Sequence, residues 1–144
     1  MEIKPYHRRA QYHETDQMAV IHHSNYIKWF EEARVDFMEQ TGYGYERSVE
    51  EGVDFAVLGI TCDYRSMVRF GEEVDILCSI TLLTASRMTV RYTITDAATG
   101  TLRTTGESRH AYVDGATKRP VSLKKRLPEL YEMFTELVAA EPAE

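Results

Sequence analysis

The fold is decided by residues 25–41, which read NYIKWFEEARVDFMEQT. Apolar side chains recur there at the spacing of one helix face, and charged side chains take the opposite side. The apolar positions are Tyr26, Trp29, Phe30, Ala33 and Phe37. Ser24 or Asn25 can cap the start of this helix, and Gly42 stands where helices commonly end. We therefore predict one long amphipathic helix over residues 25–41.

After this helix the apolar period changes to two, which is typical of β-strands. The strand parity slips between Val57 and Leu58, which predicts a β-bulge, and Gly106 is expected to interrupt the last strand. The predicted strands cover residues 3–12, 53–64, 74–82, 88–95 and 102–113.

Two further helices are expected outside the strands. A short helical turn is predicted at residues 45–51, and a final helix at residues 128–138 has Pro128 in its first position. The final helix would pack through Leu130, Tyr131, Phe134, Leu137 and Val138.

The order of these elements predicts an α+β fold in one domain over residues 1–144. A single long helix cannot cover both faces of a five-stranded sheet, so the compact solution curls the antiparallel sheet around it. The other face and the edge strands then stay exposed unless a second copy covers them. We therefore expect a homodimer or homotetramer.

Composition narrows the class of protein. The net charge of −6 argues against general nucleic-acid binding. No apolar run is long enough to span a membrane, and the N-terminal residues lack the apolar core of a secretion signal, so a cytoplasmic protein is expected. Cys62 and Cys78 fall in predicted strands without a CxxC pattern, which favours small buried side chains over redox or zinc chemistry.

Asp16 is the candidate catalytic residue because it lies in the loop just before the long helix. A helix N-terminus offers unpaired N–H groups and a partial positive charge, which suit the carbonyl oxygen of an ester or thioester. Asp16 could then act as a nucleophile or as a general base for water. The alternative is that Asp16 only caps a turn.

Three segments then carry a resemblance: residues 12–16 (YHETD), 20–26 (VIHHSNY) and 30–34 (FEEAR). They resemble the hotdog-fold acyl-CoA thioesterases of the 4-hydroxybenzoyl-CoA thioesterase type. Downstream, the resemblance is sustained by strand order and by weaker features at 112–114 and 119–121. It implies a hotdog fold, in which the curved sheet wraps the long central helix, and hydrolysis of a thioester to a free acid and coenzyme A.

The resemblance also implies roles for individual residues. Asp16 matches the catalytic aspartate, and the backbone N–H of His23 matches the group that polarises the carbonyl. Asn25 and Tyr26 match positions that shape the helix entry beside the substrate. This chain has Ala19 where the family usually has glycine, at a cost of about 1–2 kcal/mol if a left-handed backbone is required. Ala19 therefore bears on the acyl group that is accepted.

Basic side chains are candidates for holding the phosphates of coenzyme A. Arg65, Arg69 and Arg87 lie near predicted strand ends. The basic segment 118–126 could do the same, but a solvated connector into the final helix is favoured.

Several other titratable residues receive different interpretations. Adjacent His22 and His23 cannot readily chelate one metal, so no metal and no cofactor are expected beyond the coenzyme A of the substrate. His110 is predicted to face inward or to lie at an interface. Glu31 and Glu32, on the polar side of the helix, are rival carboxylates ranked below Asp16.

Two other functions stay open. The protein could hydrolyse a thioester of acyl carrier protein, or it could bind acyl-CoA without catalysis. A dehydratase is disfavoured because the carboxylate precedes the helix and has no evident histidine partner.

Overall fold

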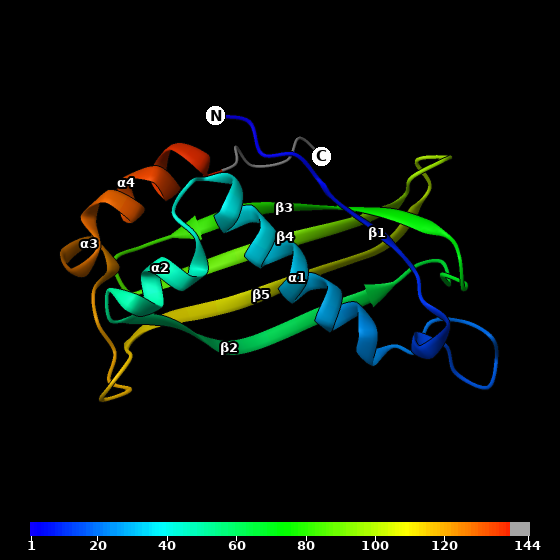
Figure 1. Cartoon of the computed structure of the whole chain (residues 1–144), viewed down its shortest axis with the longest axis horizontal. Coiled ribbons are helices and arrows are strands. Elements are labelled where there is room, and N and C mark those ends of the chain that lie inside the picture. Colours follow the sequence, from blue (N-terminus) through cyan, green and yellow to red (C-terminus); the bar gives the residue numbers. More distant parts are fainter. Residues whose placement is uncertain (139–144) are drawn as a thin grey trace.

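The computed structural model describes residues 1–138, in which a curved antiparallel sheet wraps the helix α1 (Figure 1). The sheet has five strands in the order β1-β3-β4-β5-β2. The elements are β1 (Tyr6–Arg9), a 3-10 turn (Tyr12–Glu14), α1 (Ser24–Gln40), α2 (Tyr45–Glu50), β2 (Val53–Tyr64), β3 (Glu73–Leu83), β4 (Arg87–Asp96), β5 (Leu102–Asp114), α3 (Leu123–Arg126) and α4 (Pro128–Leu137). The predicted architecture is confirmed, whereas the single domain over 1–144 includes residues 139–144, which lie outside the described part.

The predicted long helix is confirmed to within one residue at each end. The five predicted apolar positions of α1 are all buried, and Gly42 follows the helix with a left-handed φ of 82°. The predicted cap is wrong: the N-cap is His23, and Ser24 and Asn25 are the first helical residues. Their side chains are engaged elsewhere, because Ser24 Oγ bonds to His22 Nδ1 and Asn25 Nδ2 donates to a loop carbonyl.

Gly106 lets α1 approach the sheet closely. A Cβ atom at this position would lie 2.5 Å from Phe30 Cε2 and 2.7 Å from the Thr61 carbonyl oxygen. Phe30 in turn stacks on the Tyr92 ring with centroids 4.3 Å apart. The predicted interruption at Gly106 is therefore wrong, since β5 runs continuously through this residue. The Phe30 ring occupies the space that a side chain at position 106 would take.

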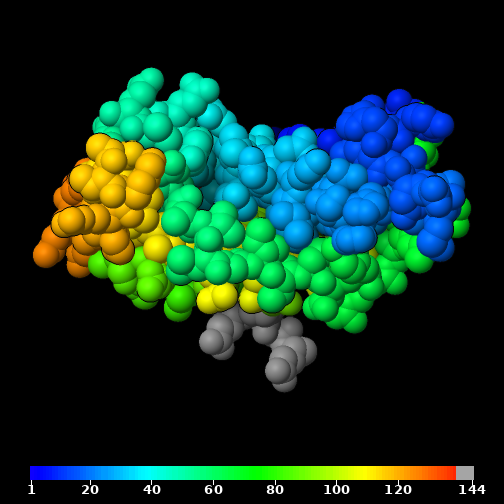
Figure 2. Space-filling model, turned by 90° about the horizontal axis from the view of Figure 1, so that it is seen from below, coloured from blue at the N-terminus to red at the C-terminus, as the bar shows by residue number. Residues whose placement is uncertain are grey.

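The strand β2 forms one edge of the sheet. Its register against β5 shifts between Val57 and Gly59, which confirms the predicted bulge. Figure 2 shows this strand, in green, running uncovered along one face of the molecule with α1 above it. Four of its large apolar side chains are 36–49% exposed: Val57, Leu58, Ile60 and Tyr64.

The two ends of the chain depart most from the sequence predictions. β1 covers only Tyr6–Arg9, so the predicted strand over residues 3–12 was too long; Pro5 immediately precedes it. The final helix begins at Pro128 as predicted, but Val138 is exposed, beyond the helix end. The segment predicted as a connector contains the short helix α3.

Helices that could span a membrane were sought among residues 1–138, and none is sufficiently long and apolar.

Candidate active site

Asp16 opens a tight turn within residues 15–21, beside the start of α1. Its N–H donates to the Val20 carbonyl at 2.8 Å, and the Ala19 N–H donates to the Asp16 carbonyl at 3.1 Å. Asp16 Oδ1 accepts a hydrogen bond from the Met18 N–H at 2.7 Å. This is the turn-capping role that the sequence left open. Oδ2 accepts no hydrogen bond within residues 1–138, so the half-buried carboxylate keeps one oxygen available.

Ala19 occupies the left-handed region, with a φ of 62°. A left-handed residue directly after a tight turn is a common loop geometry that normally uses glycine. Ala19 therefore adopts the left-handed backbone that the family's glycine would allow without strain. The cost of about 1–2 kcal/mol for a residue with a Cβ atom applies here. Across from the turn, Val20 pairs with Arg69 and the Ile21 N–H donates to the Val68 carbonyl at 2.8 Å.

The backbone N–H of His23 is a free donor at the start of α1. The neighbouring N–H groups are both engaged: that of His22 donates to the Glu14 carbonyl at 2.8 Å, and that of Ser24 donates to His22 Nδ1 at 3.2 Å. Within the described part of the chain, no acceptor takes the His23 N–H. A free N–H at the positive end of a helix is suited to a carbonyl oxygen or an oxyanion.

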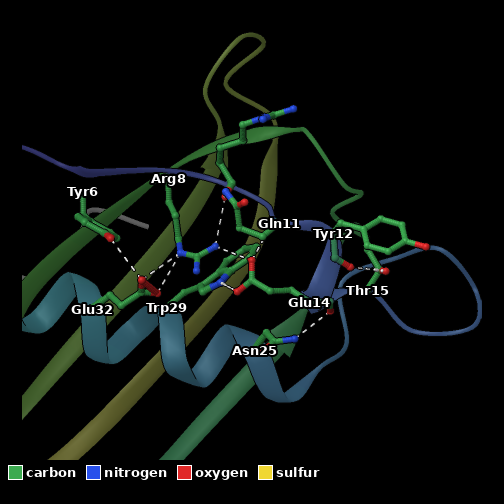
Figure 3. A network of polar contacts seen from close by, with 10 residues as sticks. Tyr6, Arg8, Gln11, Tyr12, Glu14, Thr15, Asn25, Trp29 and Glu32 are labelled. Atoms are coloured by element: carbon green, nitrogen blue, oxygen red, sulfur yellow. Dashed lines mark hydrogen bonds and ion pairs between the residues drawn. The ribbon is translucent and has the colours of Figure 1, made fainter.

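A buried carboxylate ties the loop to the helix. Figure 3 shows Glu14 within a network that reaches from β1 to α1. Its Oε2 accepts the indole N–H of Trp29 at 2.8 Å, and its Oε1 accepts Arg8 at 2.6 Å and the Gln11 N–H at 2.9 Å. Arg8 also binds Glu32 at 2.9 Å. Burial alone would raise the pKa of Glu14, but the hydrogen bonds from Arg8, Trp29 and Gln11 outweigh it and hold the pKa below its ordinary value.

The main chain of Glu14 contributes as much as its side chain. Its carbonyl oxygen accepts both the His22 N–H and the side-chain amide of Asn25, the latter at 2.9 Å. Asp16 follows Glu14 by two residues, and His23 follows His22 by one. Glu14 therefore fixes the Asp16 turn and the His23 N–H to the same point.

Two tyrosines hold the other side of the helix entry. Tyr26 is buried at 3% exposure, and its hydroxyl accepts the Val68 N–H at 3.2 Å. Tyr64, the last residue of β2, donates from its hydroxyl to the His23 carbonyl at 3.1 Å. Asn25 and Tyr26 thus both join the helix start to neighbouring loops.

The three candidate phosphate ligands separate into two groups. Arg65 and Arg69 lie in the connection between β2 and β3, where Arg69 pairs with Val20 of the Asp16 turn and the Arg65 N–H donates to the Arg103 carbonyl. Both are exposed, with no ion pair to any residue in 1–138. Arg87 begins β4 and pairs with Ala111 near the other end of β5. Within one chain, Arg87 is therefore not brought to the Asp16 turn.

The other titratable groups lie away from this turn. Glu32 is held by Arg8 and Tyr6, whereas Glu31 lines a cavity beside the second half of α1. His110 is 1% exposed and faces inward as predicted, with Nε2 bonded to Ser108 Oγ at 2.7 Å. Over residues 1–138, no three His, Cys, Asp or Glu side chains are grouped as a metal site would require.

The sequence interpretation missed the residues that support the site. Glu14 and Arg8 received no role, and Tyr64 was assigned only to a strand. The available signal was an acidic residue in the same short segment as Asp16, with an arginine six positions earlier. Such pairs have no periodic spacing, so only the folded chain brings them together.

The sequence of this chain is similar to those of known proteins over most of its length. The sequence model of the thioesterase-like superfamily matches residues 10–134. The acyl-CoA thioester hydrolase YbgC of Escherichia coli O6:H1 is 25% identical over 119 residues, which cover 83% of this chain and 88% of YbgC.

Solved structures share the fold, and two examples follow. The DHNA-CoA thioesterase from Staphylococcus aureus aligns with a TM-score of 0.88 and 28% identity, covering 92% of this chain and 89% of that one. The hypothetical protein TT1821 from Thermus thermophilus aligns with a TM-score of 0.86 and 32% identity, covering 94% and 99%. The curved sheet around a central helix is therefore the hotdog fold that the sequence resemblance implied.

Proposed function

Because this chain belongs to the thioesterase-like superfamily, we propose that it is an acyl-CoA thioesterase whose hydrolysis takes place between Asp16 and the His23 N–H. The products are a free carboxylic acid and coenzyme A. The observation that carries the assignment of the site is the free His23 N–H at the start of α1, held beside the half-buried Asp16 by Glu14.

The reaction requires one donor and one carboxylate. The His23 N–H donates to the thioester carbonyl oxygen and stabilises the negative charge that develops there. In the general-base route, Asp16 takes a proton from water, the hydroxide adds to the carbonyl carbon, and the carbon–sulfur bond breaks as the thiolate leaves. In the nucleophilic route, Asp16 itself adds and forms a mixed anhydride, which water then hydrolyses. A single turnover in ¹⁸O-labelled water tests for the nucleophilic route, because label enters the Asp16 carboxylate only when water cleaves the mixed anhydride at the Asp16 carbonyl carbon.

The carrier is assigned to coenzyme A by the charges beside the turn. Arg65 and Arg69 are exposed cations without an acidic partner in the described part, and both lie on the β2–β3 connection, where Arg69 pairs with Val20 of the turn. They are suited to the phosphates of coenzyme A, whereas Arg87 would contribute only from another copy. Comparing rates on one acyl group carried by coenzyme A or by acyl carrier protein tests this choice.

We place two copies edge to edge through β2. This strand has no neighbour on its outer side and exposes four large apolar side chains there. A two-fold axis would pair the strand with itself in antiparallel order, so that Tyr64 of one copy faces the Val53 end of the other. The His23 N–H, which is next to Tyr64, would then lie near the first half of β2 in the second copy. We expect the Ile60→Lys variant to be monomeric and to hydrolyse acyl-CoA slowly. Its sedimentation tests this pairing.

We place the enzyme in the cytoplasm and expect no metal or redox cofactor. Both cysteines are free thiols, which fits a reducing compartment, and acyl-CoA is the substrate that such a compartment supplies. Turnover is expected to be unchanged by dialysis against a chelator.

The decisive experiment is Asp16→Asn assayed by release of free thiol from acyl-CoA. We expect the fold and the melting temperature to be nearly retained and turnover to fall by roughly a hundredfold or more. The matched control is Glu46→Gln, an exposed carboxylate on α2, which should hydrolyse at the wild-type rate. Wild-type turnover in Asp16→Asn would exclude this mechanism, and stoichiometric binding without thiol release would favour a binding module.

A further inference from the structure

A buried arginine contacts the loop that carries two of the candidate phosphate ligands. This loop, residues 65–72, joins β2 to β3 and contains Arg65 and Arg69. Arg103, the second residue of β5, is 7% exposed. Figure 1 shows the 65–72 loop, the β4–β5 hairpin and the loop before α1 together at one end of the molecule. A buried guanidinium is costly unless it is paired and hydrogen-bonded, so the contacts of Arg103 indicate its role.

The side chain of Arg103 binds the 65–72 loop at two points. Its Nη2 donates to the Met67 carbonyl oxygen, and its Nη1 donates to Glu72 Oε2 at 3.0 Å. Nη1 also donates at 3.1 Å to Oδ2 of Asp96, the last residue of β4. One guanidinium therefore joins the middle and the end of the loop to the β4–β5 hairpin.

The main-chain positions of the two exposed cations both lead back to Arg103. Glu72, which binds the Arg103 guanidinium, also accepts the main-chain N–H of Arg69 through Oε1 at 2.7 Å. The Arg103 carbonyl oxygen accepts the N–H groups of Arg65 and Ser66, both at 3.0 Å. The side chain of Arg103 thus holds the half of the loop that includes Arg69, and its main chain holds the half that includes Arg65.

The Asp16 turn has a support of its own. The 65–72 loop reaches the turn where Arg69 pairs with Val20. The turn is also closed by the hydrogen bond from the Asp16 N–H to the Val20 carbonyl, and Glu14 ties it to α1. Loosening the 65–72 loop should therefore displace Arg69 more than it displaces Asp16 from the His23 N–H.

We propose that Arg103 is a positioning residue for coenzyme A, which holds Arg69 where its guanidinium binds a phosphate and so sets KM rather than kcat. A planar guanidinium suits this task because its two terminal nitrogens bind Met67, Glu72 and Asp96 together. A lysine would keep the charge but would offer one nitrogen in place of two. This inference rests on the proposed function, because it requires a substrate that carries phosphate groups.

The test compares one acyl group on two thiols, coenzyme A, which carries phosphates, and N-acetylcysteamine, which carries none. The acyl group is the one among acetyl, octanoyl and benzoyl that the wild type hydrolyses fastest. In Arg103→Lys, we expect KM for the acyl-CoA to rise roughly tenfold while kcat changes by less than about twofold. The same variant should hydrolyse the N-acetylcysteamine thioester with the wild-type kcat/KM. A merely structural role would instead impair both thioesters alike.

The matched control is Arg126→Lys, at the opposite end of the sheet in α3 (Figure 1). Arg126 Nη2 donates to Asp114 Oδ2 at 3.1 Å and to the Gly52 carbonyl oxygen at 3.3 Å, so it also joins a carboxylate to a loop. Asp114 and Asp96 each end a strand and accept two N–H groups of the turn that follows. Arg126→Lys therefore loses similar contacts away from the 65–72 loop, and its KM for the acyl-CoA should equal that of the wild type.

A second variant keeps the test decisive if Arg103→Lys folds poorly. Asp96→Asn can still accept the N–H groups of its turn but loses the ion pair to Arg103, so KM for the acyl-CoA should rise severalfold. Asp114→Asn is its control. Unchanged KM in both Arg103→Lys and Asp96→Asn, or an equal loss on the two thioesters, would overturn the inference and leave the thioesterase intact.

The wild type supplies the remaining outcomes. A higher kcat/KM for the acyl-CoA than for the N-acetylcysteamine thioester is expected if coenzyme A is bound beyond its thiol end. Equal kcat/KM for the two thioesters would overturn the inference, because the phosphates would then contribute nothing. Absence of hydrolysis for every acyl-CoA would refute the proposed function itself.

Discussion

The Glu14 carboxylate accepts the indole N–H of Trp29 at 2.8 Å, at a site where Glu14 is 4% and Trp29 0% exposed. This bond joins the loop that carries Asp16 to the helix whose start presents the His23 N–H proposed to bind the thioester. The Glu14 carbonyl oxygen makes the second attachment by accepting the His22 N–H at 2.8 Å. The two proposed catalytic elements therefore share one anchor, and that anchor is a buried ionised group.

Glu14→Gln is expected to reduce kcat by roughly tenfold to a hundredfold with little change in KM, because small misplacements of the reacting groups are costly. A neutral amide weakens the bond to Arg8 and sets one N–H against the donors around it, which should lower the free energy of unfolding by about 1–3 kcal/mol. Steady-state kinetics and urea unfolding measure both effects.

The control for this variant is Glu32→Gln, which loses a carboxylate bound to the same arginine but outside the loop anchor. It should lose less stability and keep kcat. A Glu14→Gln enzyme that unfolds more easily but retains kcat would show that Glu14 supports only the fold.

Ala19→Gly should relax the turn that carries Asp16. Removing the methyl group relieves about 1–2 kcal/mol of left-handed strain, and the extra freedom of glycine in the unfolded chain offsets roughly half of that. We expect a gain of up to about 1 kcal/mol, together with a change in the relative kcat/KM for bulky and small acyl groups. Lys118→Gly is the matched control, because Lys118 has the same φ of 62° but lies beyond β5. It should gain stability without altering acyl preference.

Much of the fold could be predicted from periodicity because the core repeats along each element. The helical spacing of α1 and the alternation of β3 and β4 correspond directly to buried positions. The order of the strands could not be predicted, since β2 pairs with β5 rather than with the next strand in the chain. The helix cap was mispredicted because Asn25 serves the Glu14 carbonyl instead of its own helix.

The site could be predicted only where its residues are close in sequence. Asp16 and His23 lie within one short segment, so their proximity to the helix start was foreseeable. Arg8, Trp29 and Tyr64 join that segment from β1, α1 and the end of β2, and their contacts depend on tertiary packing. Arg87 illustrates the converse, because a position at a strand end does not say which end of the sheet it occupies.

Gly106→Ala should destabilise the protein because its Cβ would overlap the Phe30 ring and the Thr61 carbonyl oxygen. Overpacking of this kind typically costs about 1–3 kcal/mol, and the backbone oxygen cannot rotate away. Thermal unfolding should show a clearly lower midpoint. Gly115→Ala is the matched control, since its Cβ would meet nothing nearer than 3.7 Å. Equal midpoints for the two variants would contradict the close approach of α1 to β5.

His110 predicts how stability changes in mild acid. Burial, and then the charge of Arg34, lower the pKa of His110 from 6.5 to about 4. Between these values the unfolded chain binds a proton that the folded protein does not, so the free energy of unfolding falls as the pH falls from 6.5 toward 4, by at most about 3 kcal/mol. Glu14 affects stability at lower pH than His110. Because folding lowers the pKa of Glu14, its contribution to the free energy of unfolding is lost only below pH 4.5, its ordinary pKa.

Urea unfolding at a series of pH values, compared between the wild type and His110→Gln, isolates this contribution. The variant keeps a polar partner for Ser108 but has no proton to bind in this range, so its stability should depend less steeply on pH between 6.5 and 4. The difference in slope, and not the absolute stability, is the relevant quantity, since a glutamine in this buried place carries its own cost. Identical slopes would mean that His110 binds a proton as readily in the folded protein as in the unfolded chain.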